Sequence, residues 1–242
     1  MTAIEHQPVA LITGASRGLG YALTTTLARR GWHAVVDARD RDRLDAAFAD
    51  VSGPGAVTPI PGDVTDPAHR QRLVAEVVAR GGLDLLVNNA SRLGPSPQPR
   101  LADYPLDVLA EVYATNAIAP LALVQMALPS LQQRAGRIIN VTSDAAIEPY
   151  SGWGGYGSSK AALDQLTNIL GAEHPELRVY AFDPGDMNTD LHQQAFPGED
   201  IGDRAAPQSV VPALLRLIES DLPSGRYRAA VLRGIEIPAA TA

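Results

Sequence analysis

Tyr156 and Lys160 lie four positions apart in the segment Tyr-Gly-Ser-Ser-Lys, a spacing that could support proton transfer. On a helix, residues four apart share one face. An unperturbed phenol has a pKa of about 10 and is a poor acid or base at neutral pH. Because a neighbouring ammonium group favours the phenolate, we expect Lys160 to lower the pKa of Tyr156 and to make it a usable proton donor or acceptor.

Ser143 precedes Tyr156 by 13 residues and follows a predicted strand. Its hydroxyl could donate a hydrogen bond to a carbonyl oxygen and stabilise negative charge there. Lys160 is the only lysine among 20 Lys and Arg residues, which indicates a position where arginine would not serve. Taken singly, Tyr156 would more often be a packing residue, Ser143 a helix or turn cap, and Lys160 a solvated charge. Together they predict a catalytic set.

A glycine-rich segment, residues 13–20 (TGASRGLG), lies between the first predicted strand and the first predicted helix. Glycines at 14, 18 and 20 allow a tight turn and a close approach of the backbone to a phosphate. The N-terminus of the helix behind them favours negative charge. An ordinary turn is the alternative, but the position at the first strand-to-helix junction predicts a dinucleotide site.

The end of the second predicted strand, residues 35–40 (VVDARD), bears on the choice of cofactor. An acidic side chain there would bind the ribose of NAD, and an arginine would accommodate the 2′-phosphate of NADP. Ala38 stands where the acidic residue would be, so Arg39 with Arg17 predicts a phosphate clamp and NADP as the preferred cofactor. Alternatively, Arg39 is a solvated charge. Asp37 could be a ribose-binding carboxylate, a helix cap or an ion-pair partner.

Apolar runs with strand character alternate with helical patterns along the chain. Strands are predicted at 8–13, 33–37, 56–61, 83–88, 136–142, 177–182 and 227–232, and helices at 17–30, 41–50, 67–80, 105–133, 155–172 and 208–219. This alternation predicts an α/β fold, a single doubly wound parallel sheet of Rossmann type with helices on both faces, over residues 1–242. Residues 185–207 show little strand pattern and are predicted to form a substrate-binding loop or lid.

Composition narrows the possible functions. The 242 residues suffice for one core and are few for two average domains. A net charge of −7 does not support nucleic-acid binding, and the absence of cysteine excludes disulfides and thiolate metal sites; no metal site is expected. No apolar run approaches the roughly 20 residues of a membrane span, and residues 1–7 carry no export signal. We therefore expect a cytoplasmic protein that associates with no membrane.

Taken together, these motifs resemble the short-chain dehydrogenase/reductase family over nearly the whole chain, from Val9 to Leu232. The resemblance rests on the cofactor loop at 13–20, the adenine-contacting pair Asp63-Val64, the segment Asn88-Asn89-Ala90-Ser91, Asn116, the set Ser143, Tyr156 and Lys160, and Pro184-Gly185 followed by Met187 and Thr189. One departure is Ser91, which replaces the usual glycine and adds a side chain beside the cofactor.

The resemblance implies hydride transfer between nicotinamide C4 and the carbonyl carbon of a ketone or secondary alcohol. Tyr156 would exchange the proton, Ser143 would orient the oxygen, and Lys160 would hold the ribose and tune Tyr156. Asn116 would bind a water that links Lys160 to solvent, or kink the long helix, or both. The implied cofactor-binding residues are Gly14, Ser16, Arg17, Gly18, Leu19, Gly20, Arg39, Asp63, Val64, Asn89, Ala90, Ser91, Tyr156, Lys160, Pro184, Gly185, Met187 and Thr189. A homodimer or homotetramer through helices 105–133 and 155–172 is also implied.

Loops 91–101, 144–155 and 185–207 would face the substrate. They contain the apolar residues Leu93, Pro95, Pro97, Ile147, Tyr150, Trp153, Met187, Leu191 and Phe196, and the polar residues Arg92, Arg100, Glu148, His192 and Asp200. This mixture predicts a medium-sized, partly apolar ketone or alcohol, cyclic or aromatic in character. His192 could touch it, although a lone histidine on a loop is more often exposed to solvent.

Two rival functions remain open on the sequence. The same site could run a non-redox or coupled step such as dehydration, epimerisation or cyclisation. Alternatively, the chain could be a catalytically silent NADP-binding sensor, a class that tends to lose the tyrosine or the lysine. Following nicotinamide absorbance during turnover would distinguish these functions from an oxidoreductase.

Overall fold

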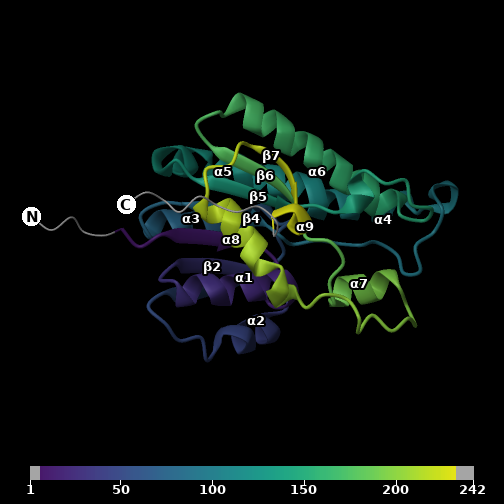
Figure 1. Ribbon diagram of the computed structural model, residues 1–242, viewed down its shortest axis with the longest axis horizontal. Helices are drawn as coiled ribbons and strands as arrows, with labels where there is room; N and C mark the ends of the chain where they lie inside the picture. Colours follow the sequence, from purple (N-terminus) through teal and green to yellow (C-terminus); the bar gives the residue numbers. More distant parts are fainter. Residues whose placement is uncertain (1–5, 233–242) are drawn as a thin grey trace, which may run out of the picture.

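The computed structural model describes residues 6–232; residues 1–5 and 233–242 lie outside the described part, and with them most of the N-terminal segment considered for an export signal. Seven strands form one parallel sheet in the order β3-β2-β1-β4-β5-β6-β7 (Figure 1). They are β1 (Val9–Ile12), β2 (His33–Ala38), β3 (Ala56–Pro61), β4 (Leu85–Asn88), β5 (Arg137–Val141), β6 (Arg178–Asp183) and β7 (Gly225–Arg228). The prediction of a doubly wound α/β sheet is confirmed.

Helices cover both faces of this sheet. One face packs against α1 (Gly18–Arg29), α2 (Arg41–Phe48) and α8 (Val211–Glu219), and the other against α3 (Pro67–Ala79), α5 (Ala119–Arg134) and α6 (Gly154–Glu173). In Figure 1, α6 lies at the top of the view and α2 at the bottom, and α8 crosses the middle, between the labels of β4 and β2. Shorter helices are α4 (Leu106–Tyr113), α7 (Asp190–Ala195) and α9 (Ala229–Leu232), with 3-10 turns at Leu101–Asp103, Asp144–Ala146 and Pro207–Ser209.

The central strand β1 is buried at every position, as expected for a parallel strand that is covered on both faces. Its side chains alternate between the two cores. Ala10 and Ile12 join the cluster beneath α1 and α8, whereas Val9 and Leu11 join the cluster beneath α3 and α5. The strand order reverses at β1, which pairs with β2 on one side and β4 on the other. In such sheets, the crevice for a ligand lies beyond the carboxyl ends of the strands at this reversal.

Two sequence predictions for the C-terminal third need correction. The last strand was expected at 227–232, but β7 ends at Arg228 and residues 229–232 form α9. Ala229 and Leu232 are three apart and both buried in the core, a spacing that suits a helical turn. In addition, residues 185–207 are not all loop, because they contain helix α7.

The long helical stretch Leu106–Arg134 comprises α4, a π-helical turn at Ala114–Ile118, and α5. Its length and hydropathy would also suffice for a membrane span. However, Leu123, Val124, Ala127 and Leu131 are fully or almost fully buried against the sheet and α3, so it is a helix of the protein core.

Candidate active site

The glycine loop after β1 and the chain after β4 are interlocked at the reversal of strand order. Gly14 has a φ of +66°, and a Cβ atom there would lie 2.8 Å from the Cα of Ala90, so only glycine fits. The side-chain amide of Asn89 donates to the carbonyls of Thr13 (2.8 Å) and Gly14 (3.0 Å). The Thr13 hydroxyl accepts the N–H groups of Asn89 and Ala90, both at 3.0 Å. The position of the loop is therefore fixed before any ligand binds.

The N-terminus of α1 is arranged to receive an anion. Arg17 occupies the cap position without a capping side-chain hydrogen bond, and the first turn contains no acidic residue. The N–H groups in the first turn of α1 and the helix dipole can therefore bind a phosphate. Leu19 is buried in the core beneath α1, so only its backbone is available to a cofactor.

Three arginines form a positive cluster: Arg17 after β1, Arg39 after β2 and Arg43 on α2. The pKa of the Arg17 guanidinium is lowered by burial and by the charges of Arg43 and Arg39. Asp190 of α7 forms an ion pair with Arg17 and lies 3.4 Å from Arg43. A carboxylate of this chain thus occupies the positive cluster, as a bound phosphate would. The sequence analysis did not predict a role for Arg43 or Asp190, because 147 residues separate them and only the fold brings them together.

Asp37 is buried and hydrogen-bonded, and it caps no helix within residues 6–232. It is 1% exposed. One carboxylate oxygen accepts the N–H of Gly14 (2.8 Å), and the other accepts from Nε2 of His69 (3.0 Å). The cap of α2 is instead Asp40. Both oxygens of Asp37 are therefore engaged in supporting the glycine loop.

The adenine-contacting pair predicted at Asp63-Val64 follows β3. Burial favours a higher pKa for Asp63, but two hydrogen bonds from Thr65 and the nearby charge of Arg39 bring it below its ordinary value. The Val64 side chain is buried in the core next to α3. The carboxylate of Asp63 is thus ionised and oriented at the same edge as the arginines.

Ser143, Tyr156 and Lys160 meet beyond the carboxyl end of β5. Ser143 caps the 3-10 turn that follows β5, and its hydroxyl donates to Asp144 (3.0 Å). Tyr156 and Lys160 share a face of α6, as their spacing predicted, and are 6% and 2% exposed. The Lys160 ammonium donates to the carbonyl of Val141 (2.8 Å) and lies 5.6 Å from the centre of the Tyr156 ring.

The acid–base properties of this pair differ from the sequence prediction. A lowered pKa was expected for Tyr156, but burial raises it to about 12, an effect that the nearby hydroxyls of Ser91 and Ser143 only partly offset. Burial by Leu93, Ala145 and Leu191 around the phenol is the cause. Burial also lowers the pKa of Lys160 to about 8, against the attraction of Asp164. The phenol is therefore protonated at neutral pH.

Asn116 lies at the π-helical turn, fully buried. Its amide donates to the carbonyl of Arg92 (2.9 Å) and to Ser159 on α6 (2.9 Å), and its oxygen accepts from the N–H of Arg92 and the hydroxyl of Ser91. The side chain thus joins the segment after β4 to α6, next to Tyr156. The turn confirms an irregularity of the long helix at Asn116; its water-binding role stays a prediction.

The Pro184-Gly185 motif follows β6. Gly185 has a φ of +72°, and its N–H donates to Asp183 (3.0 Å). Met187 then forms an isolated parallel bridge with Ala205, and Thr189 caps α7. These contacts fold residues 185–207 back onto themselves beside the candidate site.

The three loops predicted to face the substrate converge around Tyr156. Leu93, Ala145 and Tyr156 form a buried cluster, with Trp153 and Leu191 packed against it. The Trp153 ring lies edge-on to Tyr156, with ring centroids 5.9 Å apart. The Phe196 ring is tilted against Trp153, also with centroids 5.9 Å apart. Residues from 93, 145–156 and 191–196 thus line one apolar surface next to the phenol.

His192 departs from its expected exposure. Its side chain is 11% exposed and stacks on Phe196, with ring centroids 4.9 Å apart. Nε2 is buried, and within residues 6–232 no partner binds it. Other predicted polar residues, Arg100, Glu148 and Asp200, are exposed, as are the apolar Ile147 and Tyr150.

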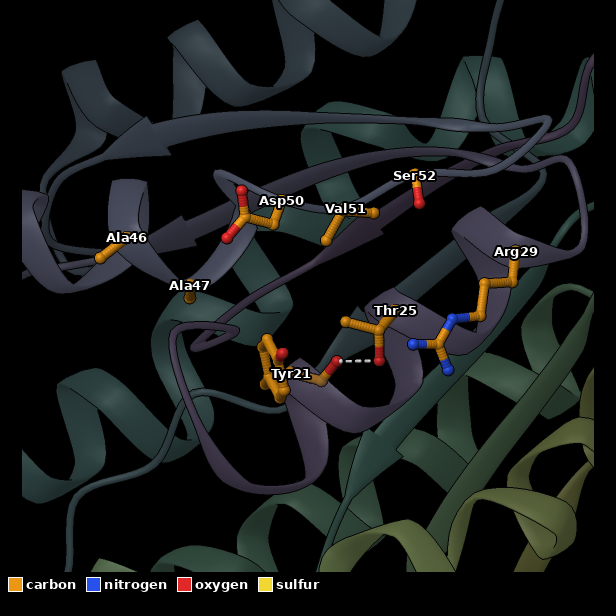
Figure 2. A pocket seen from close by; sticks show the side chains of 8 residues that line it. All are labelled: Tyr21, Thr25, Arg29, Ala46, Ala47, Asp50, Val51 and Ser52. Atoms are coloured by element: carbon orange, nitrogen blue, oxygen red, sulfur yellow. Dashed lines mark hydrogen bonds between the residues drawn. The ribbon is translucent and has the colours of Figure 1, made fainter.

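A cavity of about 210 Å³ lies elsewhere, between α1 and α2. Figure 2 shows Tyr21, Thr25 and Arg29 of α1 facing it, opposite the end of α2. None of the predicted catalytic or cofactor-binding residues lines this cavity, so it is separate from the candidate site.

The chain matches the family described as short chain dehydrogenase over residues 8–200. The sheet, the interlocked glycine loop and the Ser143, Tyr156 and Lys160 cluster agree with this match. The chain belongs to the short-chain dehydrogenase/reductase family and is an oxidoreductase of that family.

Several characterised proteins are similar to it. Sepiapterin reductase of Mus musculus is 35% identical over 204 residues, 77% of this chain and 77% of that protein. A benzil reductase that forms (S)-benzoin, from Saccharomyces cerevisiae, is 29% identical over 246 residues, 94% of this chain and 91% of that protein. The structure of an alcohol dehydrogenase from the archaeon Thermococcus sibiricus, complexed with 5-hydroxy-NADP, has a TM-score of 0.83 and 27% identity, and covers 92% of this chain and 95% of that one.

Proposed function

We propose that this enzyme is an NADPH-dependent reductase of a medium-sized, partly aromatic ketone. The observation that carries the proposal is the position of the Tyr156 phenol, which lies beside Lys160 and is packed edge-on against Trp153 on an apolar surface. The hydroxyl of a phenol can give its proton to a carbonyl oxygen as that carbonyl is reduced. The aromatic surface beside it suits a planar substrate.

In this mechanism, the chemistry that NADPH would supply when bound is a hydride for the carbonyl carbon. The Tyr156 hydroxyl gives its proton to the carbonyl oxygen, so the product is a secondary alcohol. Ser143 turns its hydroxyl from Asp144 to the same oxygen and stabilises the developing charge. Lys160 would stabilise the phenolate that remains and would bind the cofactor ribose. Trp153 and Leu93 exclude water from the reacting carbonyl.

Preference for NADP is supported by the residues at the end of β2. Arg17 and Arg39, with Arg43, form a cluster in which Asp190 already takes the place of an anion. Asp37, the alternative ribose ligand, has both carboxylate oxygens engaged. The complex of the similar archaeal alcohol dehydrogenase with 5-hydroxy-NADP is in keeping with this choice.

Cofactor choice is tested by fluorescence titration with NADPH and NADH. We expect tighter binding of NADPH, and Arg39→Gln should weaken NADPH binding about 10-fold or more, the worth of a charge-assisted hydrogen bond to a phosphate. Arg41→Gln removes the same charge two positions away and should change neither affinity. Equal affinity of the native protein for both cofactors would contradict the preference.

Substrate class is tested with benzil, which the name of the similar yeast enzyme suggests. Consumption of NADPH is followed at the nicotinamide absorbance band, with 2,3-butanedione as an aliphatic diketone control. We expect faster turnover of benzil, and Trp153→Leu should reduce this advantage by raising KM for benzil alone. Conversion of a substrate without any change in nicotinamide absorbance would instead favour a dehydration, epimerisation or cyclisation.

We propose four further properties with this function. Residues 1–242 form one domain, and residues 185–207 act as a lid whose Asp190 contacts the glycine loop. The protein is cytoplasmic. It is also a homodimer or homotetramer, because Leu106, Ile118 and Ile169 on α4 to α6 are 77%, 60% and 43% exposed. Light scattering after size-exclusion chromatography measures the assembly, and charged substitutions at Ile118 and Ile169 should dissociate it.

A further inference from the structure

Arg226 on the edge strand β7 reaches across β6 toward the candidate catalytic residues. Its Nη2 donates to the main-chain carbonyl of Ser143 and to the carboxylate of Asp183, both at 3.0 Å. Its Nε donates to Asp164, also at 3.0 Å. The Arg226 side chain is 20% exposed, and those of Asp164 and Asp183 are 14% and 2% exposed. One guanidinium thus binds three groups from three different elements.

Each of the three groups belongs to, or adjoins, a residue assigned to the reaction. The first is the main chain of Ser143 itself, at the end of β5. The second, Asp164, lies one helical turn after Lys160 on α6 and attracts its ammonium. The third, Asp183, uses its other oxygen to accept the N–H of Gly185 at the start of the nicotinamide-side motif. In the part of the chain that the structure describes, no other side chain contacts all three.

The two carboxylates need this partner, because a buried carboxylate without a counter-charge is strongly unfavourable. Burial raises the pKa of Asp164, and the nearby Thr142 hydroxyl, the hydrogen bond and charge of Arg226 and the charge of Lys160 oppose that rise. The other cation near Asp183 is Arg228, 3.5 Å away but 62% exposed. A planar guanidinium can meet two carboxylates and a carbonyl at once, which a single ammonium group does less well.

We propose that Arg226 is a positioning residue for catalysis: it holds the main chain of Ser143 in register with α6 and with Gly185. The inference rests on the proposed function, since that function assigns Ser143 and Lys160 to the reaction. Without the guanidinium, the end of β5 loses its link to α6 and β6. The Ser143 hydroxyl is then displaced relative to Tyr156, and small displacements of this kind are costly in rate.

The test uses Arg226→Ala with added ethylguanidinium, which restores the atoms that the substitution removes. We expect kcat for ketone reduction to fall on the order of 10²-fold, with a much smaller change in KM and in the Kd for NADPH. Ethylguanidinium should restore a large part of kcat, and ethylammonium should not. Arg226→Lys, a milder change in case the alanine variant unfolds, should also lose kcat. Arg228→Gln removes a neighbouring charge and should retain it.

A second readout does not depend on turnover. Amide hydrogen exchange in residues 143–147 and 183–187 should become faster in Arg226→Ala, return toward native rates with ethylguanidinium, and stay unchanged in Arg228→Gln. Native exchange rates in the alanine or lysine variant, an unchanged kcat, or equal rescue by ethylammonium would each overturn the proposal. If the native protein reduces no ketone, the proposed function fails, while the exchange data still decide whether Arg226 fixes these segments.

Discussion

Replacing the buried lysine should make the protein inactive and more stable. Lys160 is 2% exposed, and burial lowers its pKa from the ordinary 10.5 to about 8. The folded state therefore disfavours the charged form relative to the unfolded chain. At about 1.4 kcal/mol per pKa unit, the penalty near pH 7 is about 3 kcal/mol. Lys160→Met keeps the length and apolar stem of the side chain and removes this penalty.

Part of that gain is lost again. The ammonium donates a hydrogen bond to the carbonyl of Val141, and leaving this acceptor without a partner costs about 1 kcal/mol. The net expectation is that Lys160→Met raises the free energy of unfolding by about 2 kcal/mol near pH 7, or the melting temperature by about 4–8 °C for a chain of this size. A buried catalytic charge is then a case in which function is retained at the expense of stability.

The pH dependence gives the sharper test. The folded pKa lies below the unfolded pKa, so between about pH 8 and 10.5 the unfolded chain binds more protons and the stability of the native protein rises with pH. The advantage of Lys160→Met should therefore shrink across this window. Urea unfolding of the cofactor-free proteins, followed by tryptophan fluorescence at about pH 7 and about pH 10, measures it. Lys160→Arg keeps a permanent charge and should gain nothing. A methionine variant that is less stable than the native protein near pH 7 would refute the reasoning.

Three further outcomes are expected. Tyr156→Phe should lower kcat by about 10²–10⁴-fold with little change in the Kd for NADPH, because the ring packing remains and the transferable proton is lost; near-native turnover would argue against the proposed acid. Asp190→Asn frees Arg17 from its internal carboxylate, and should tighten NADPH binding by up to about fivefold, the worth of an exposed ion pair. NADH titration is the control, and an equal gain there would contradict the assignment of Arg17 to the 2′-phosphate. Ser91→Ala removes a hydroxyl that lowers the pKa of Tyr156, so alcohol oxidation at a given alkaline pH should slow; an unchanged pH profile would place Ser91 outside the reaction.

Local sequence patterns were enough to predict most of the fold and much of the candidate site. The alternation of apolar runs and helical stretches is enough to predict a parallel sheet, because each strand and each helix is encoded by its own residues. The same holds for the glycine loop and for the shared helix face of Tyr156 and Lys160. Gly14 illustrates why: its positive φ and its contact with Ala90 are demands on a single position.

Contacts between segments that are distant in the sequence could not be predicted from it. Arg226 binds a carbonyl 83 residues earlier, and Asp190 meets Arg43 across 147 residues. The residue types of β7 do not show that Arg226 binds groups at the candidate site whereas Arg228 is mostly exposed. His69 is a similar case, since only the packing of α3 against β2 brings it to Asp37.

The direction of the Tyr156 pKa has the same origin. Sequence spacing correctly placed Lys160 on the same helix face, and from that placement a lowered pKa followed. The burial that reverses the sign comes from three loops that are remote in sequence, through Leu93, Ala145 and Leu191 around the phenol. Burial opposes formation of the phenolate, so it makes the Tyr156 hydroxyl a weaker acid than a solvated phenol, whichever direction the reaction runs.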